Sequence, residues 1–320
     1  MKLEDIGFYT LSDERAKRAE QHTPLMRAEL ILTHRCNLQC KYCRGMASYL
    51  QGDISSFDAH EIIVNWAAEG LQNIRFSGGE PTLHDSLLKL VATAKLRGVK
   101  RIAVSTNGTA SIQLYDDLMA AGVNDFSVSL DACCAGTTET ITGANIHDAL
   151  LSTIKYLAAR SYTTVGIVVN ADNLNQAADV ITLADSLGVA DIRIIPSAQY
   201  SEKLPDIFTV ADEVLGCHPI LKYRIERMRK GLPTRGIHKQ DNTRCPLVLD
   251  DIAVAGSYHF PCIIYLREAG NPIGKMGSNF RAERVEWYKT HNVTTDPICC
   301  NNCLDVCVDY NNRWREYHNG

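Results

Sequence analysis

One short pattern recurs four times in this 320-residue chain and restricts the folds that the chain can adopt. Each copy has a glycine, then an apolar residue, then two further residues and an apolar residue of the next segment; the copies begin at Gly70, Gly98, Gly122 and Gly188. A glycine of this kind ends a helix in the left-handed conformation, and the apolar residue folds back onto the last turn before a strand begins. Four such joints predict a repeated unit of helix and strand.

Hydrophobic periodicity extends this repeat to six strands separated by five helices. The predicted strands cover residues 29–33, 73–76, 101–104, 125–128, 165–169 and 191–195, and the helices cover 58–68, 85–97, 112–121, 146–159 and 174–187. Strands that alternate with helices form a parallel sheet with right-handed crossovers, either open or curled into a barrel. The predicted fold class is therefore α/β, and the 45% hydrophobic content is enough to bury a large core.

In both architectures the active site lies beyond the carboxyl ends of the strands, so the loops that follow the strands are informative. These loops are rich in polar and glycine residues. In chain order they contain three cysteines, Ser77-Gly78-Gly79-Glu80-Pro81, Ser105-Thr106-Asn107-Gly108, Ser129-Leu130-Asp131, Asn170 and Pro196-Ser197. We expect them to surround one pocket.

The first of these loops places Cys36, Cys40 and Cys43 in a C-x-x-x-C-x-x-C spacing directly after an apolar strand. Three thiolates on one loop can bind three irons of a cubane cluster and leave the fourth iron open for chemistry. A structural zinc ion or a chance group of buried thiols is the alternative. Zinc sites usually pair C-x-x-C units, so this spacing suits zinc poorly.

This cysteine spacing, with the aromatic Tyr42 before the third cysteine, resembles the signature of the radical S-adenosylmethionine (SAM) superfamily. The resemblance implies a [4Fe–4S] cluster on Cys36, Cys40 and Cys43, and a partial (βα)6 TIM-like barrel. It also implies that SAM is cleaved by one electron from an external donor of the flavodoxin or ferredoxin type. The products would be methionine and a 5'-deoxyadenosyl radical that abstracts hydrogen from a substrate carbon.

The resemblance assigns SAM contacts to the loops. A glycine pair lets a backbone approach a ligand closely, and its carbonyls can accept bonds from an ammonium group. In the family the GGEP motif, here Gly78, Gly79, Glu80 and Pro81, binds the amino group of SAM. By the same resemblance the other cofactor-binding candidates are Tyr42, Ser105, Asn107 and Ser129. Many relatives carry an arginine for the SAM carboxylate about ten residues after the Ser-Leu-Asp loop; residues 132–145 have none, so that contact must come from elsewhere.

Cysteines resume in the last third of the chain. Cys245 and Cys262 have hairpin spacing, and a cluster of Cys299, Cys300, Cys303 and Cys307 follows. This arrangement resembles the one-cluster auxiliary domains called twitch, rather than the two-cluster type called SPASM. We expect Cys245, Cys262, Cys300 and Cys303 to bind a second [4Fe–4S] cluster, with Cys299 and Cys307 as substitutes. A zinc knuckle made from the same thiols is the alternative.

These patterns predict three parts: an N-terminal extension over residues 1–28, a partial barrel over 29–210 and an auxiliary domain over 211–320. In the extension we expect a short surface helix over 12–21. In the auxiliary domain we expect a helix over 211–230 and short strands at 247–249 and 252–254.

Three further cysteines, Cys133, Cys134 and Cys217, are candidate catalytic thiols. A thiol near the pocket could return a hydrogen atom to a substrate radical, as in radical epimerases. Inert buried thiols are the alternative reading.

Charge gives a mixed indication about the substrate. The formal net charge of −4 argues against indiscriminate binding to polyanions. Residues 222–244 nevertheless hold eight basic side chains against Glu226 and Asp241. This span either binds a phosphate-bearing or nucleic-acid substrate, or is a solvated helix face.

Twelve cysteines are many for a cytoplasmic protein, in which disulfides are rare, so we interpret them mainly as metal ligands. The charged first residues and the lack of a long apolar run predict a cytoplasmic protein that does not enter a membrane.

Three substrates remain open. The segments around 8–16 and 30–45 resemble radical SAM proteins found with phage DNA-hypermodification genes, one type of which isomerises an amino-acid-modified thymidine. The others are a peptide and an aminocyclitol or sugar. A non-catalytic iron-sulfur electron carrier is a further alternative, but the intact GGEP motif speaks against it.

Overall fold

The protein was analysed as a computed structural model that describes residues 13–45, 50–197 and 209–318. These residues divide into two compact units. The first contains Met1–Arg35, Arg44–Ala103 and Arg235–Gly320, and the second contains Cys36–Cys43 and Val104–Thr234. The predicted division into residues 1–28, 29–210 and 211–320 stays a prediction.

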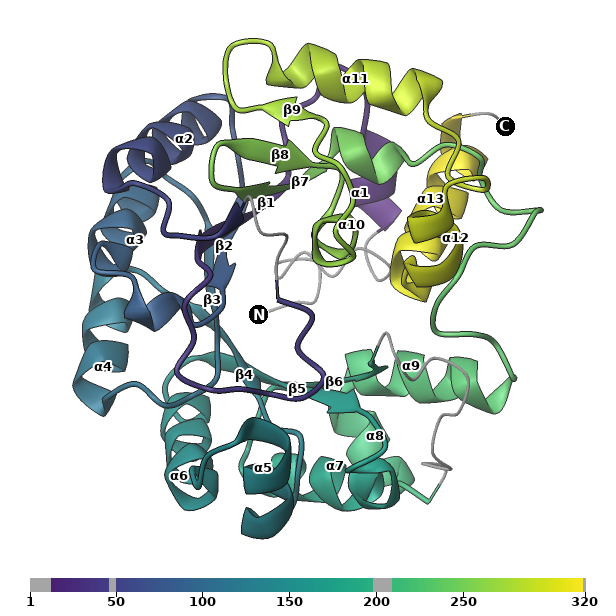
Figure 1. The fold of residues 1–320 in the computed structure, drawn as a ribbon. Helices are drawn as coiled ribbons and strands as arrows, with labels where there is room; N and C mark the ends of the chain where they lie inside the picture. The colour runs from purple at the N-terminus through teal and green to yellow at the C-terminus, as the bar shows by residue number, and fades with distance from the viewer. Residues whose placement is uncertain (1–12, 46–49, 198–208, 319–320) are drawn as a thin grey trace. The chain divides into compact units, whose positions relative to one another are not determined.

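The first unit is built on a mixed sheet with strand order β2-β1-β7-β8-β9 (Figure 1). These strands are β1 (Arg27–Thr33), β2 (Asn73–Gly78), β7 (Asp251–Ala255), β8 (Tyr258–Phe260) and β9 (Gly274–Lys275). β1 pairs in parallel with β2 on one side and with β7 on the other, while β7, β8 and β9 pair antiparallel. All residues of β1 except Arg27 are buried, because a central parallel strand is covered on both faces.

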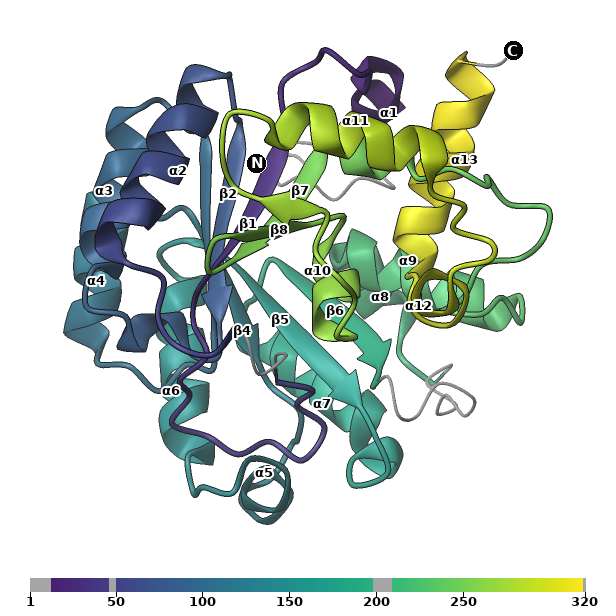
Figure 2. The same ribbon diagram turned by 45° about the horizontal axis from the view of Figure 1, so that its top comes forward.

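Helices α1 (Asp13–Arg18), α2 (Ser56–Ala68), α3 (Leu87–Leu96), α10 (Ile263–Arg267), α11 (Phe280–Thr290), α12 (Pro297–Asn302) and α13 (Asp305–His318) complete this unit. Two 3₁₀ turns, Pro81–Leu83 and Pro246–Leu249, connect its elements. In Figures 1 and 2, α11 lies beside the β7–β8 hairpin.

One buried guanidinium group attaches α11 to this sheet. Arg284 donates to the carbonyls of Val248 at 3.0 Å and Phe260 at 2.9 Å, and also to that of Asp251. Burial lowers the pKa of Arg284 to about 9. Since a buried charge needs hydrogen-bond partners, these three carbonyls fix α11 on the 3₁₀ turn and on strands β7 and β8.

The second unit has parallel strands in the order β6-β5-β4: β4 (Asp125–Ser129), β5 (Tyr162–Val169) and β6 (Asp191–Pro196). Its helices are α4 (Ile112–Ala121), α5 (Ala135–Thr142), α6 (His147–Ala158), α7 (Ala177–Ser186), α8 (Asp212–Cys217) and α9 (Pro219–Arg229), with a 3₁₀ turn at Leu174–Gln176. β3 (Arg101–Thr106) begins in the first unit and ends in the second. The predicted α/β class with parallel strands is confirmed.

The four predicted joints are present. Gly70, Gly98, Gly122 and Gly188 have φ angles of +98°, +86°, +130° and +75°, and the apolar residue after each glycine is buried. In the first three joints the N–H of that apolar residue also bonds back to the helix, as Leu71 does to the Trp66 carbonyl at 3.0 Å. The glycine prediction is therefore confirmed at each joint.

Three local predictions need correction or completion. The helix expected over 211–230 is broken into α8 and α9, because Pro219 lacks the N–H that a continuous helix would need. Residues 247–249 form a 3₁₀ turn that starts at Pro246, not a strand, although all are buried. Helix α5 was missed because its sequence, AGTTETIT, contains β-branched residues with weak helix propensity.

The helix expected over 12–21 forms over Asp13–Arg18, and residue 12 lies outside the described residues. The strand expected at 252–254 lies inside β7. Within the described ranges, no helix combines the length and the apolar character that crossing a membrane requires.

Candidate functional site

The three-cysteine loop is held by the end of helix α5. The Gln39 N–H donates to the Thr142 carbonyl at 2.9 Å, and the Lys41 N–H donates to the Ile141 carbonyl at 3.0 Å. These carbonyls belong to the last turn of α5, where helix carbonyls have no partner inside the helix. A helix that sequence reasoning missed therefore positions the loop.

Tyr42 attaches the same loop to a buried carboxyl group. Its hydroxyl donates to Asp131 Oδ2 at 2.6 Å, and Asp131 Oδ1 accepts the Val168 N–H at 2.7 Å. Burial raises the pKa of Asp131 to about 6. Tyr42 thus has a structural role in the loop; its predicted contact with SAM stays a prediction. Asp131, from the Ser-Leu-Asp loop, was not among the predicted site residues.

Asn107, after β3, reaches the first cysteine. Its side-chain nitrogen lies 3.8 Å from Cys36 Sγ and donates to Asn37 Oδ1 at 2.8 Å. Ser105 lies inside β3, half-buried, and Ser129 is the exposed last residue of β4. The structure therefore brings Asn107 to the cysteine loop.

The loop's thiols suit an iron-sulfur cluster. Cys36 and Cys43 are exposed, Cys40 is half-buried, and all three are free. Burial raises the pKa of Cys40 to about 12, and the neighbouring Asp131 and Cys43 add to this. A thiolate at Cys40 therefore needs positive charge beside it, which iron ions supply.

The Gly78-Gly79-Glu80-Pro81 turn packs tightly on the end of β1. The Gly79 N–H donates to the Thr33 carbonyl and the Glu80 N–H to the Arg35 carbonyl, both at 2.8 Å. A Cβ on Gly79 would lie 2.2 Å from the Arg35 carbonyl oxygen, and one on Gly78 would lie 2.3 Å from that of Thr33. Both glycines are required because the backbones touch. The buried Glu80 carboxylate caps the following turn by accepting the Thr82 N–H at 3.1 Å.

An arginine from α10 occupies the carbonyl side of this turn. Arg267 Nη2 donates to the Gly78 carbonyl at 2.7 Å, and Nη1 lies 3.4 Å from the Gly45 carbonyl. The next residue, Glu268, forms an ion pair with Arg44. Burial opposes ionisation of Glu29 on β1, but guanidinium groups that include Arg267 hold the pKa of Glu29 below its ordinary value. Sequence reasoning missed Arg267, since no motif marks it.

Four C-terminal thiols interact with one another. Burial raises the pKa of Cys245 to about 11. The hydrogen bond with Asn311 opposes this rise, and the charge of Cys307 contributes to it. Burial and then Cys307 raise the pKa of Cys262. A hydrogen bond with Cys307, and after it burial, raise the pKa of Cys303. The charges of Cys245 and Cys262 add to this rise. Such a group of soft sulfur ligands suits an iron-sulfur cluster or zinc.

The adjacent cysteines Cys299 and Cys300 face different partners. The Cys300 thiol donates to the Thr294 carbonyl at 2.9 Å, and its own carbonyl accepts the Ile237 N–H at 3.0 Å. Burial raises the pKa of Cys299, and the charges of Cys245 and Cys262 add to this rise. The expected set of Cys245, Cys262, Cys300 and Cys303 stays a prediction.

The three candidate catalytic thiols have separate surroundings. Cys133 donates to Gln176 Oε1 at 3.3 Å, and burial raises its pKa. Cys134 is exposed at the start of α5, and a hydrogen bond with Thr137 lowers its pKa. Cys217 is the exposed last residue of α8. Their catalytic role stays a prediction.

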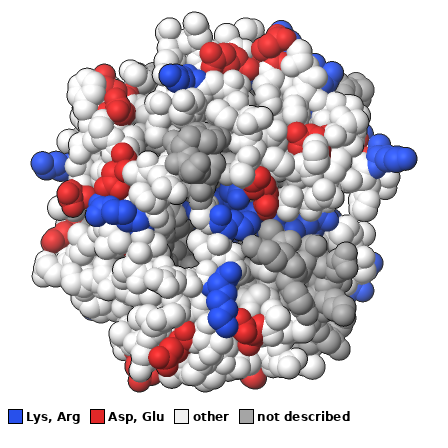
Figure 3. Space-filling model, in the orientation of Figure 1, with Lys and Arg blue, Asp and Glu red and all other residues white. Residues whose placement is uncertain are grey.

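Two of the eight basic residues of 222–244 are not on the surface. Arg224 and Arg235 are buried, and Arg244 donates to the His291 carbonyl at 2.7 Å. On α9, Lys222 lies 4.0 Å from Glu226. On the face drawn in Figure 3, both basic and acidic side chains are exposed. Much of this local positive charge therefore stabilises the fold or has acidic neighbours.

Comparison with known sequences gives a family match and similarity to GTP 3',8-cyclases. Residues 30–184 match the family described as the Radical SAM superfamily. A probable GTP 3',8-cyclase from Saccharolobus solfataricus is 30% identical over 175 residues, which are 54% of this chain and 57% of the cyclase. GTP 3',8-cyclase 1 from Mycobacterium tuberculosis is 30% identical over 178 residues, 52% of this chain and 49% of that protein. The chain thus spans about half the length of these relatives.

Solved structures share the fold over most of the chain. Streptococcus suis SuiB bound to the precursor peptide SuiA aligns with a TM-score of 0.60 and 13% identity, covering 89% of this chain and 69% of SuiB. Native anSMEcpe with bound AdoMet and a peptide aligns with a TM-score of 0.57 and 14% identity, covering 92% of this chain and 96% of anSMEcpe. These likenesses agree with the predicted partial-barrel fold.

From the neighbours of the C-terminal thiols we predict which of these cysteines is dispensable. Cys307→Ser should lower bound iron and acid-labile sulfide by one cluster, because Cys307 interacts with three other thiols. Cys300→Ser should leave both unchanged, because its thiol is directed to the Thr294 carbonyl. Both are measured on anaerobically reconstituted protein, with Cys217→Ser as control. Iron loss in Cys300→Ser alone would contradict this assignment.

Proposed function

We propose that this chain reductively cleaves SAM and abstracts hydrogen from a carbon atom of its substrate, because residues 30–184 match the Radical SAM superfamily. The observation that carries the proposal is the loop of three reachable thiols inside that domain, which α5 and Asp131 hold in place. The GGEP turn, packed on the end of the strand that leads into this loop, supports it.

Cys36, Cys40 and Cys43 are the proposed ligands of a [4Fe–4S] cluster. When bound, that cluster supplies the electron that breaks a C–S bond of SAM, and an external flavodoxin- or ferredoxin-type protein is the proposed electron donor. The chain's own residues hold the thiolates in place. Asn107, 3.8 Å from Cys36 Sγ, is placed to donate toward that sulfur and so to influence the cluster's potential.

Gly78 and Gly79 are the proposed site for the amino group of SAM, with Ser105, Asn107 and Ser129 as further contacts. Arg267 is the proposed partner of the SAM carboxylate, the contact for which residues 132–145 offer no arginine. Its guanidinium already lies 2.7 Å from the Gly78 carbonyl. In SAM the carboxylate and the amino group share one carbon, so a cation beside the glycine turn is well placed for the carboxylate.

The C-terminal thiols are the proposed ligands of an auxiliary [4Fe–4S] cluster. In an oxidation such a cluster would accept the electron of the product radical, whereas an isomerase returns the hydrogen and needs no net electron acceptor. Cys133, Cys134 and Cys217 are the proposed hydrogen-returning thiols in the isomerase case.

For the substrate, we keep an amino-acid-modified thymidine in phage DNA as the first candidate, with isomerisation as the reaction. It rests on the resemblance of the segments around 8–16 and 30–45, of which residues 8–12 lie outside the described residues. The second candidate is a peptide, supported by the peptide-bound SuiB and anSMEcpe structures. An aminocyclitol or sugar remains the third.

Reductive cleavage of SAM is the first test. Anaerobically reconstituted protein should form 5'-deoxyadenosine when mixed with SAM and a reductant. Replacing Cys36, Cys40 and Cys43 together by alanine should abolish the product, because no cluster can then bind SAM. Chromatography of the products measures both. A protein with its full iron content that forms no 5'-deoxyadenosine would be an electron carrier instead.

The role of Arg267 is testable by affinity. Losing a charged hydrogen bond should raise the dissociation constant of SAM roughly 10- to 100-fold in Arg267→Ala, and less in Arg267→Lys. Equilibrium dialysis measures it. Lys289→Ala, an exposed charge on α11, controls for net charge. Thermal unfolding of the SAM-free protein shows whether Arg267→Ala also destabilises the glycine turn, and so separates a change in SAM affinity from a change in the fold. Unchanged affinity in Arg267→Ala would remove Arg267 from the site.

Isotope transfer distinguishes the substrates. Incubation with deuterated candidates should place deuterium in 5'-deoxyadenosine only for the true substrate, since the radical takes hydrogen from the reacting carbon. Modified DNA, peptides and aminocyclitols are compared by mass spectrometry. Transfer from a peptide but not from modified DNA would overturn the first candidate.

A further inference from the structure

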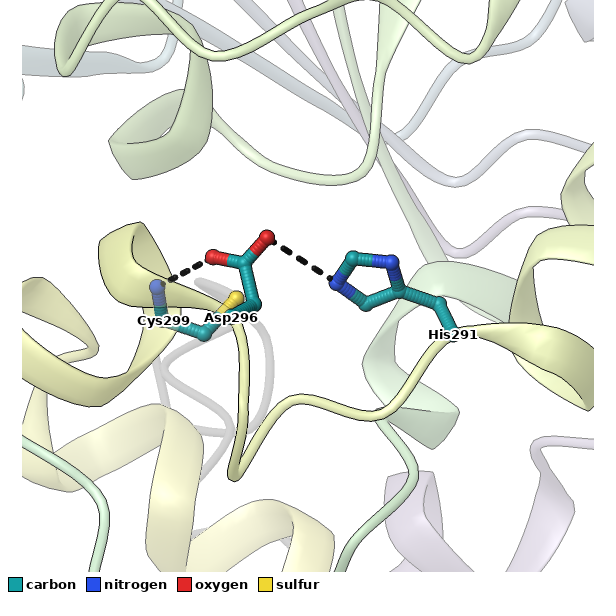
Figure 4. Close-up of side chains that lie close together, drawn as sticks. All are labelled: His291, Asp296 and Cys299. Carbon is teal, nitrogen blue, oxygen red and sulfur yellow. Dashed lines mark hydrogen bonds and ion pairs between the residues drawn. The ribbon is translucent and has the colours of Figure 1, made fainter.

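Three different metal-binding side chains converge in the first unit. The ligand atoms of His291, Asp296 and Cys299 all lie within 4.8 Å of one another. Figure 4 shows the Asp296 carboxylate between the His291 ring and the Cys299 side chain. His291 Nε2 and Asp296 Oδ2 are 3.3 Å apart. The group thus offers one nitrogen, one oxygen and one sulfur ligand.

The loop between α11 and α12 creates this convergence. His291 follows the last residue of α11, and its N–H donates to the Trp287 carbonyl at 2.8 Å. Asp296 precedes α12 and accepts the Cys299 N–H at 2.8 Å through Oδ1. The remaining oxygen, Oδ2, is the one that faces His291. All three residues are half-buried.

Neighbouring aromatic residues fix the orientation of two of the side chains. The Trp287 ring stacks on His291 with centroids 4.1 Å apart and planes 16° from parallel. The Tyr265 hydroxyl donates to Asp296 Oδ2 at 3.0 Å. Such outer contacts are typical of metal sites, where they orient the ligands.

The contact between His291 and Asp296 has the spacing of two ligands on one ion. His291 Nε2 is buried, and its approach to Asp296 lacks hydrogen-bond geometry. Two zinc bonds of about 2.0 Å that meet at a tetrahedral angle place their ligand atoms about 3.3 Å apart. Thiolates of a cubane sit on separate irons and lie farther apart, so this close group suits a single ion.

We propose that His291 Nε2, Asp296 Oδ2 and Cys299 Sγ bind one divalent transition-metal ion, with Zn²⁺ as the best match to this mixed ligand set. Three protein ligands leave a fourth position open. The site takes Cys299 and leaves Cys245, Cys262, Cys303 and Cys307 for the auxiliary cluster. It also joins α11 to α12, whose adjacent residue Cys303 is one of those thiols.

Metal analysis of iron-replete protein tests the site. Two variants remove a ligand but keep its packing: His291→Phe retains a ring to stack on Trp287, and Asp296→Asn retains the oxygen that accepts the Cys299 N–H. His318→Phe is the matched control, because His318 stacks on Trp314 with centroids 4.3 Å apart and planes 9° from parallel. Zn²⁺ is titrated against a chromophoric chelator, and Co²⁺ substitution reports thiolate ligation by its charge-transfer absorption.

Wild type and His318→Phe should bind one Zn²⁺ equivalent in addition to their iron. His291→Phe and Asp296→Asn should bind it at least tenfold more weakly, with iron and sulfide unchanged. The site is overturned if His291→Phe binds zinc like the wild type, or if Cys299→Ser loses one cluster's iron. None of these measurements requires SAM or turnover, so they are independent of the proposed reaction.

Discussion

The pairing of β1 on both sides is the constraint on which the first unit depends. β2, the next strand along the chain, pairs with it in parallel on one side, and β7 pairs with it in parallel on the other side from residues more than two hundred positions later. The register places Arg27 opposite both Asn73 and Asp251. The C-terminal cysteine segment is therefore built onto the same sheet as the GGEP strand, and is not joined to it only through a linker.

This shared sheet explains why residues distant in sequence act on the same turn. β7 leads through β8 into α10, and α10 supplies Arg267 to the Gly78 carbonyl at the end of β2. The same hairpin receives Arg284 from α11, which fixes the helix that precedes His291. The glycine turn, the thiol group and the proposed zinc ligands thus all depend on strands that pair with β1 or extend its sheet.

Sequence reasoning succeeded where structure is set within a few residues. The four glycine joints were predictable because a left-handed helix end needs glycine and an apolar neighbour, whatever the rest of the chain does. It failed for α5, whose threonine-rich sequence forms a helix only in its tertiary setting. It also could not choose among adjacent cysteines, because Cys299 and Cys300 differ by which way a helix turns them.

The sequence by itself determined the match of residues 30–184 to the Radical SAM superfamily, the three-cysteine loop, the glycine turn and the parallel α/β class, since each depends on residue types at short, fixed spacing. Tertiary structure alone decided that α5 holds the cysteine loop and that Arg267 meets the glycine turn. It alone brought His291, Asp296 and Cys299 together and buried Arg224 and Arg235 of the apparent basic cluster. The physical reason is that hydrogen bonds and burial between distant segments follow from sheet pairing and helix packing, which no local pattern records.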